Sequence, residues 1–212
     1  MKLLEGERPV YALTEKTLSD MADRQKRREY FFRSAVRCAA LTLLFIAAGC
    51  FYYIYRREGG HTAAVFRFSD GAFDIRGVLK RLFFSSLIPV IGLTSCFAFG
   101  GRISRLCDTL LPALYGAYSG FALFDAFVRL SASFTVSNTV NSLPFILYTV
   151  GVITVYLLFC PVCAAFGECR RREKADDGDI KYCTGCFFAA LTALTALSLL
   201  EEFFVFILNV LS

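Results

Sequence analysis

Long runs of apolar residues, separated by short polar and charged segments, dominate the chain after residue 37. Five of these runs carry few or no charges and have about the 20 residues that a helix needs to cross a bilayer. Strand-like alternation is absent, so α-helices must satisfy the backbone hydrogen bonds within the lipid. The sequence therefore predicts an all-α, polytopic membrane bundle with five transmembrane helices, at about 38–55, 82–101, 109–128, 143–165 and 187–211.

Composition agrees with a membrane setting. Of the 212 residues, 56% are hydrophobic and 23 are Phe, and the mean hydropathy of +0.54 is far above that of soluble proteins. Residues 1–34 precede the first apolar run and are expected to form a cytoplasmic N-terminal segment, with 35–212 as the membrane domain. Because the leader is long and no small-residue cleavage site follows Tyr55, a cleaved signal peptide is not expected.

The distribution of basic residues predicts the orientation. Thirteen Lys and Arg residues lie near one set of helix ends and seven near the other, which favours an N-in, C-out topology. A helix from Thr14 to Phe32 would carry its basic end to the anionic inner leaflet. Alternatively, these charges act only as a positive-inside anchor.

Two of the predicted spans carry acidic residues. Asp125 lies in the third span with Arg129 four residues on, a spacing at which the two can pair, and Glu201 and Glu202 interrupt the fifth. Successive residues of a helix point about 100° apart, so we expect only one of the two glutamates to share the face of its span. Intramembrane carboxylates point to function or to a partner by default. A structural cluster, a partner or lipid contact, and an ion pathway are the three alternatives.

Small residues recur at intervals of four in two neighbouring spans. Gly92, Cys96 and Gly100 form such a row in the second span, and Gly116 and Gly120 form one in the third. Rows of this kind let helices approach closely. Because a short turn joins the two spans, we expect them to pack together through these rows, with self-association of the chain as the alternative.

Two C-x-x-C pairs flank the charged segment between the fourth and fifth spans. Nineteen residues separate Cys163 from Cys183, a spacing that often marks zinc sites. An antiparallel helical hairpin would bring the pairs together at its base, where four thiolates form a closed, structural site. The predicted ligands are Cys160, Cys163, Cys183 and Cys186. A redox pair and simple packing of small apolar thiols are the alternatives.

Signs of catalytic chemistry are few. His61 is the only histidine, which excludes H-E-x-x-H metalloproteases, and no nucleotide-binding glycine motif occurs. We therefore expect the protein not to be an enzyme, to have no cofactor apart from a structural zinc ion, and to have no nucleic-acid partner.

The sequence from "SSLIPVIGLTSCFAFGG" to "LLPALYGAYSGFALF", together with "LLEEFF" in the last span, resembles the stage II sporulation protein M family of integral membrane proteins. The similarity covers roughly residues 82–125 and 199–204 and includes the glycine rows and Glu201. It implies a non-catalytic scaffold of the cell membrane that positions peptidoglycan-remodelling partners, in contact with lipid and other cell-envelope membrane proteins. The alternative is a small transporter or permease subunit that uses Asp125 and Glu201.

Overall fold

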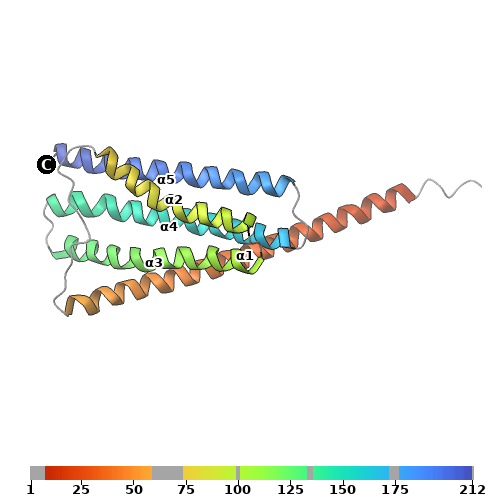
Figure 1. Ribbon diagram of the computed structural model, residues 1–212, viewed down its shortest axis with the longest axis horizontal. Coiled ribbons are helices and arrows are strands. Elements are labelled where there is room, and N and C mark those ends of the chain that lie inside the picture. Colours follow the sequence, from red (N-terminus) through yellow and green to blue (C-terminus); the bar gives the residue numbers. More distant parts are fainter. Residues whose placement is uncertain (1–7, 59–73, 99–100, 133–135, 172–176, 212) are drawn as a thin grey trace, which may run out of the picture.

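The computed structural model describes residues 8–58, 74–98, 101–132, 136–171 and 177–211. This described part contains five long α-helices, which form one elongated bundle (Figure 1). They are α1 (Arg8–Glu58), α2 (Ile75–Ala98), α3 (Gly101–Ala132), α4 (Val136–Arg171) and α5 (Asp177–Leu211). We call the end of the bundle from which α1 projects the proximal end, and the end at which α2 begins the distal end.

Each helix contains a segment that is long and apolar enough to cross a membrane. The segments are Phe31–Arg56, Ile75–Ala98, Arg102–Ser131, Ser142–Gly167 and Asp177–Leu208. Large apolar side chains also cover the outside of the bundle, with 72% of Phe51 and 65% of Leu158 exposed. Such an apolar surface is stable in contact with lipid, whereas its exposure to water is unfavourable. The predicted all-α membrane fold is confirmed, and the chain is a multi-pass membrane protein.

The helices extend well beyond the predicted apolar runs. α3 begins at Gly101 rather than near residue 109, and α5 begins at Asp177 rather than at 187. Asp177 and Asp179 occupy the first turn of α5, where carboxylates favour the positive end of the helix dipole. Polar residues therefore belong to both helices, ahead of the apolar runs predicted from the sequence.

Two prolines lie well inside helices, Pro112 in α3, which begins at Gly101, and Pro144 in α4, which begins at Val136. Both prolines are fully buried, as are Pro89 and Pro161. Membrane helices tolerate such prolines because neighbouring helices and polar side chains satisfy the freed backbone groups.

The first helix is much longer than a membrane span. α1 has 51 residues, which at 1.5 Å per residue gives about 76 Å, against about 30 Å for the hydrocarbon layer. It runs without a break through the predicted boundary at residues 34 and 35. The part of α1 that precedes the span projects beyond the other helices (Figure 1). Residues 8–34 therefore continue the first span as one helix.

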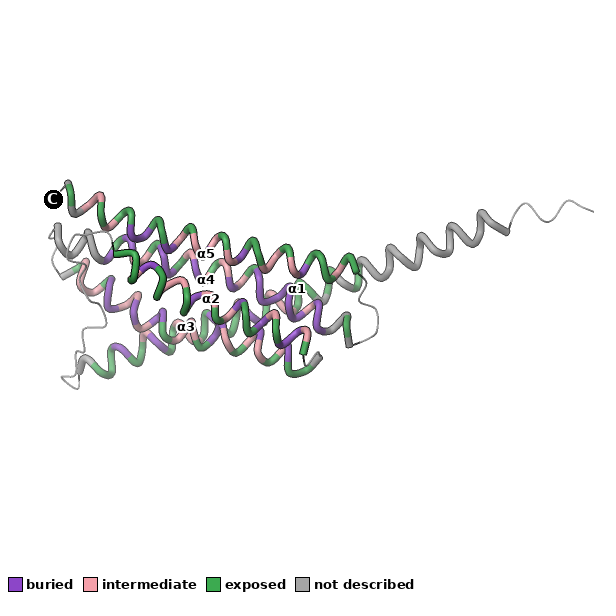
Figure 2. The backbone as a smooth tube through the Cα atoms, turned by 45° about the horizontal axis from the view of Figure 1, so that its top comes forward, coloured by how far each residue is buried: buried purple, intermediate pink, exposed green. Residues whose placement is uncertain are grey.

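The helix α4 is the centre of the bundle and contacts all four other helices. α1 packs mainly on α3, while α2 lies against α3, α4 and α5. Figure 2 shows buried residues along the sides of the helices that face one another. One stripe of α4, with Tyr148, Val152, Tyr156 and Phe159, supplies much of the core. Its spacing of three and four residues is that of a single helix face.

The glycine row of α3 packs against α1 and not, as expected, against α2. A Cβ atom on Gly120 would lie 2.8 Å from the Ile46 Cα, and one on Gly116 would lie 2.9 Å from the Thr42 carbonyl oxygen. From the opposite side, a Cβ on Gly49 would lie 2.8 Å from the Phe121 nitrogen. Three glycines thus let two backbones touch, which is how small residues join membrane helices. The short turn between α2 and α3 did not decide the pairing.

The other predicted row is seen only in part. Gly92 of α2 faces α3 and α4, because its Cβ would lie 2.9 Å from Asp108 Oδ1 and 3.7 Å from the Phe159 ring. Cys96 is fully buried one turn later. Gly100 lies outside the described residues. The second row therefore helps to hold α2 in the bundle, where it contacts the start of α3.

We predict that Gly120→Ala alone lowers the stability of the bundle. The added methyl group meets the Ile46 backbone, which cannot move aside as a side chain would, so overpacking should cost about 1–3 kcal/mol of unfolding free energy. Gly120→Ile should cost more. Unfolding of the purified protein in detergent by heat or denaturant measures the change.

The matched control is Gly185→Ala in α5, since nothing lies within 4 Å of a Cβ placed there. This variant should be as stable as the parent protein or slightly more stable, because alanine favours helix. Equal stability of the two alanine variants would contradict the close contact of α1 and α3.

Candidate functional site

At the distal end, Arg81 of α2 forms ion pairs with two successive glutamates of α5. The Arg81 Nε lies 3.0 Å from Glu201 Oε2, and its Nη2 contacts Glu202 Oε2. The glutamate side chains are only 7% and 4% exposed, whereas that of Arg81 is 31% exposed. The planar guanidinium offers donors in several directions and so can serve both carboxylates. A buried charge cluster therefore joins α2 to α5.

Both glutamates belong to this cluster, although successive residues of a helix point about 100° apart. The two side chains do leave α5 in different directions, but the long Arg81 side chain reaches both. Glu202 also accepts a hydrogen bond of 2.9 Å from the backbone nitrogen of Asp74, just before α2. The start of α2 is thus fixed by the same carboxylates.

A second polar cluster joins α1 to α3. Asp125 accepts a hydrogen bond of 2.8 Å from the Tyr53 hydroxyl and one of 3.0 Å from Arg129 Nε. Asp125 and Tyr53 are 5% and 8% exposed. The predicted pairing of Asp125 with Arg129, four residues apart, is confirmed. Of the three alternatives for these acids, the structural cluster agrees best with the geometry, because each carboxylate has partners inside the bundle.

The four predicted zinc ligands do not come together as one set. Among the described residues, no three of Cys160, Cys163, Cys183 and Cys186 have sulfur atoms within 4.8 Å of one another. The first three are buried in the core, and Cys186 packs against it. The four sulfur atoms therefore do not form the predicted tetrahedral set in this arrangement.

A different group, with one residue from each of three helices, has the proximity that a metal site requires. Cys96 of α2, Asp108 of α3 and Cys163 of α4 are all buried, and their ligand atoms lie within 4.8 Å of one another. The Cys96 thiol lies 3.0 Å from the Cys163 carbonyl oxygen, to which it donates. The Ser104 hydroxyl donates to Asp108 Oδ2 at 2.9 Å. This buried cluster joins α2, α3 and α4.

The second carboxylate oxygen of this cluster has no hydrogen-bond partner. Asp108 is 1% exposed, and its Oδ1 is buried without a donor among the described residues. Gly92 leaves the space that this oxygen occupies. Two thiols and a carboxyl oxygen are ligands that suit Zn²⁺. Cys183 of α5 interacts with the Cys163 side chain and so brings a further thiol next to this group.

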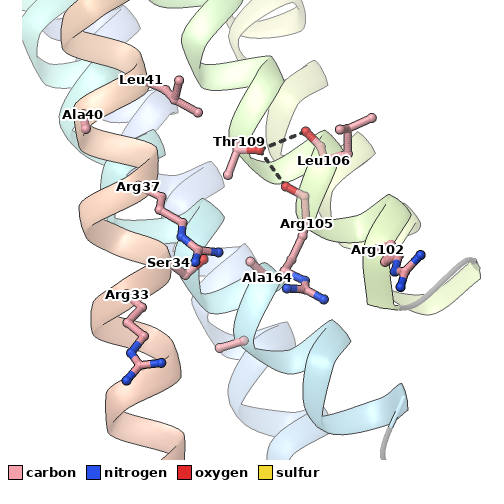
Figure 3. A pocket seen from close by; sticks show the side chains of 11 residues that line it. Arg33, Ser34, Arg37, Ala40, Leu41, Arg102, Arg105, Leu106, Thr109 and Ala164 are labelled. Carbon is pink, nitrogen blue, oxygen red and sulfur yellow. Dashed lines mark hydrogen bonds between the residues drawn. The ribbon is translucent and has the colours of Figure 1, made fainter.

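A cavity of about 660 Å³ lies at the proximal end between α1, α3 and α4. Four arginines line it: Arg33 and Arg37 from α1, and Arg102 and Arg105 from α3. Figure 3 shows that the side chains of Arg37 and Arg105 extend from opposite sides into the space between the helices.

Several residues of these clusters were missed in the sequence. In the sequence, Arg81 was noted only as one of the basic residues near a helix end, and Tyr53 only as part of an apolar run. Ser104 and Asp108 are four residues apart at the edge of the predicted third span, which is the spacing of a shared helix face. That signal was present, but the pairing of Arg81 with α5 depends on which helices are neighbours.

We predict that Arg81→Met strongly destabilises the bundle. The change leaves two buried carboxylates without their cation, and breaking a buried pair in this way costs about 3–5 kcal/mol. Unfolding in detergent measures the loss, with Lys80→Met as the control, since Lys80 is the exposed neighbour on α2. Adding Glu201→Gln and Glu202→Gln to Arg81→Met should restore part of the stability. A loss as small as that of Lys80→Met would contradict a buried charge cluster.

We also predict that any zinc held by the purified protein depends on the three-helix group. Cys96→Ser, Cys163→Ser and Asp108→Asn should each lower the zinc content, because each removes a ligand. Cys186→Ser should leave the content unchanged. Elemental analysis after chelator-free purification measures it. Loss of zinc in the Cys186 variant but not in the Cys96 variant would contradict the three-helix group and support the predicted site of the two C-x-x-C pairs.

Comparison with known proteins adds nothing to this geometry. No family model matches the chain, and neither a curated protein nor a solved structure matches it. The resemblance of residues 82–125 and 199–204 to the stage II sporulation protein M family stays a prediction. The chain is a five-helix, multi-pass membrane protein whose helices are joined by buried polar clusters.

Proposed function

We propose that this protein is a non-catalytic membrane scaffold that positions peptidoglycan-remodelling proteins of the cell envelope. The observation that carries the proposal is the continuity of α1, which leaves the bundle as one unbroken helix. Such a helix holds a partner at a fixed distance and direction from the membrane. A flexible linker would fix neither the distance nor the direction of the partner.

The attachment of α1 supports this role. Its span is fixed to α3 by the contacts of Gly49, Gly116 and Gly120 and by the hydrogen bond from Tyr53 to Asp125. These contacts lie along the span itself, so the helix from which the projecting part continues is held firmly in the bundle. A partner bound to the projecting part would therefore be held by the bundle, because the described helix has no break between the two.

The arrangement of the acids also favours a scaffold over the transporter alternative. A transporter that uses Asp125 or Glu201 requires a water-filled path to one of them. Neither residue lines the arginine-lined cavity of about 660 Å³ or the cavities of about 510 and 500 Å³. Their partners are Arg81, Arg129 and Tyr53, so the acids serve to hold helices together.

We predict that deletion of residues 8–24 abolishes recovery of the partners while the bundle stays folded. The deletion removes most of the projecting helix and leaves every described contact of the span. Co-purification from native membranes, with mass spectrometry of the recovered proteins, should detect peptidoglycan-remodelling proteins with the full chain only. Thermal unfolding of both forms in detergent serves as the folding control.

Two results would contradict the proposal. Equal recovery of the same envelope proteins with and without residues 8–24 would remove the role of the projecting helix. Substrate or ion flux through proteoliposomes that is lost in Asp125→Asn or Glu201→Gln, with stability retained, would favour the transporter instead.

A further inference from the structure

We propose that the arginine-lined cavity at the proximal end binds the phosphate headgroup of an anionic phospholipid. This inference is independent of the proposed scaffold function, because it concerns the bundle and not the projecting helix. The chemistry that the cavity recognises is a phosphate ester at the level of the membrane surface.

The cavity offers guanidinium groups from two helices. Arg33 and Arg37 are four residues apart on α1, and Arg102 and Arg105 are three apart on α3, so each pair lies on one face of its helix. Arg37 and Arg105 extend into the space from opposite sides (Figure 3). Guanidinium groups bind phosphate oxygens with two parallel hydrogen bonds. A phosphate placed between α1 and α3 would therefore be held from both sides.

The charges of the lining leave room for an anion. None of the described residues that line the cavity is acidic. Arg33 has a carboxylate nearby, but Glu29 lies 4.0 Å away and both side chains are mostly exposed, at 70% and 59%, so this pair contributes little. Like charges that face one cavity repel each other, and a bound phosphate removes that repulsion.

The rest of the lining favours a lipid over a soluble phosphate. Leu41 and Leu106 line the same cavity as the arginines, which suits a ligand with a charged head and an apolar tail. The site also lies at the membrane surface: Arg33 and Arg37 are near the start of the first span, and Arg102 begins the third. Basic pockets between transmembrane helices at this level bind anionic headgroups.

The shape of the cavity depends on small residues of α4. Ala164, which is 2% exposed, and Ala165 line it and leave the volume open. The Thr109 hydroxyl is already engaged, because it donates to the Arg105 and Leu106 carbonyl oxygens at 2.7 and 3.2 Å. The arginines are the charged side chains of the lining.

The test compares lipid binding to the full chain and to two double variants. Arg37→Gln with Arg105→Gln removes one cation from each side of the cavity. Arg56→Gln with Lys80→Gln removes the same charge from exposed positions near the distal end. Native mass spectrometry counts the bound lipids after reconstitution with phosphatidylglycerol, cardiolipin or phosphatidylcholine. Titration in detergent gives the apparent Kd.

We expect phosphatidylglycerol and cardiolipin to bind the full chain more tightly than phosphatidylcholine does. The Arg37 and Arg105 variant should weaken that binding at least about tenfold, the loss that follows from one missing charge-assisted hydrogen bond. The distal variant should bind as the full chain does. If the glutamine variant fails to fold, Arg37→Lys with Arg105→Lys replaces it, and the loss should be smaller but present, since lysine lacks the planar fork.

Three results would overturn the proposal. Equal weakening in the distal variant would mean that the charges attract anionic lipid without a site. Equal binding of phosphatidylcholine would remove the requirement for an anionic headgroup. Full competition by inorganic phosphate at the concentration of the lipid would assign the cavity to a soluble anion.

Discussion

The direct contact of two backbones along α1 and α3 is the constraint on which the rest of the bundle depends. Lipid supplies no hydrophobic drive between helices, so association relies on dispersion contacts and polar bonds. Gly49, Gly116 and Gly120 let the two helices touch. Among the described helices, α1 otherwise contacts only α4. The contact between α1 and α3 therefore fixes both the span and the part of α1 that projects from it.

Polar clusters add direction to these contacts. One joins α2 to α5 through Arg81, one joins α1 to α3 through Asp125, and one joins α2, α3 and α4 around Asp108. Dispersion alone would allow the helices to slide or rotate, since apolar surfaces are interchangeable. A buried charge has few satisfactory partners, so each cluster selects one register of its helices.

The sequence predicted the features that depend on composition and on local spacing. Apolar runs located the five spans, and the four-residue spacing of Asp125 and Arg129 predicted their ion pair. The predictions that failed concern distant parts of the chain. Gly120 meets α1 rather than α2, and Arg81 reaches Glu202, because tertiary packing decides neighbours that chain proximity does not. The C-x-x-C pairs of α4 and α5 likewise do not converge as one set of four, because the packing of α2, α3 and α4 brings Cys163 next to Cys96 and Asp108 instead.

The order of contacts has a consequence for the biogenesis of the protein. α1 and α2 follow each other in the chain, yet they share no contact among the described residues. Synthesis delivers α1 to the membrane before its main neighbour α3 exists. Until α3 is inserted, the glycine face of Gly49 and the hydroxyl of Tyr53 must be covered by lipid or by another membrane protein. The bundle therefore cannot assemble before the third helix is inserted. Until then, an insertase or chaperone would have the largest uncovered surface of α1 to bind.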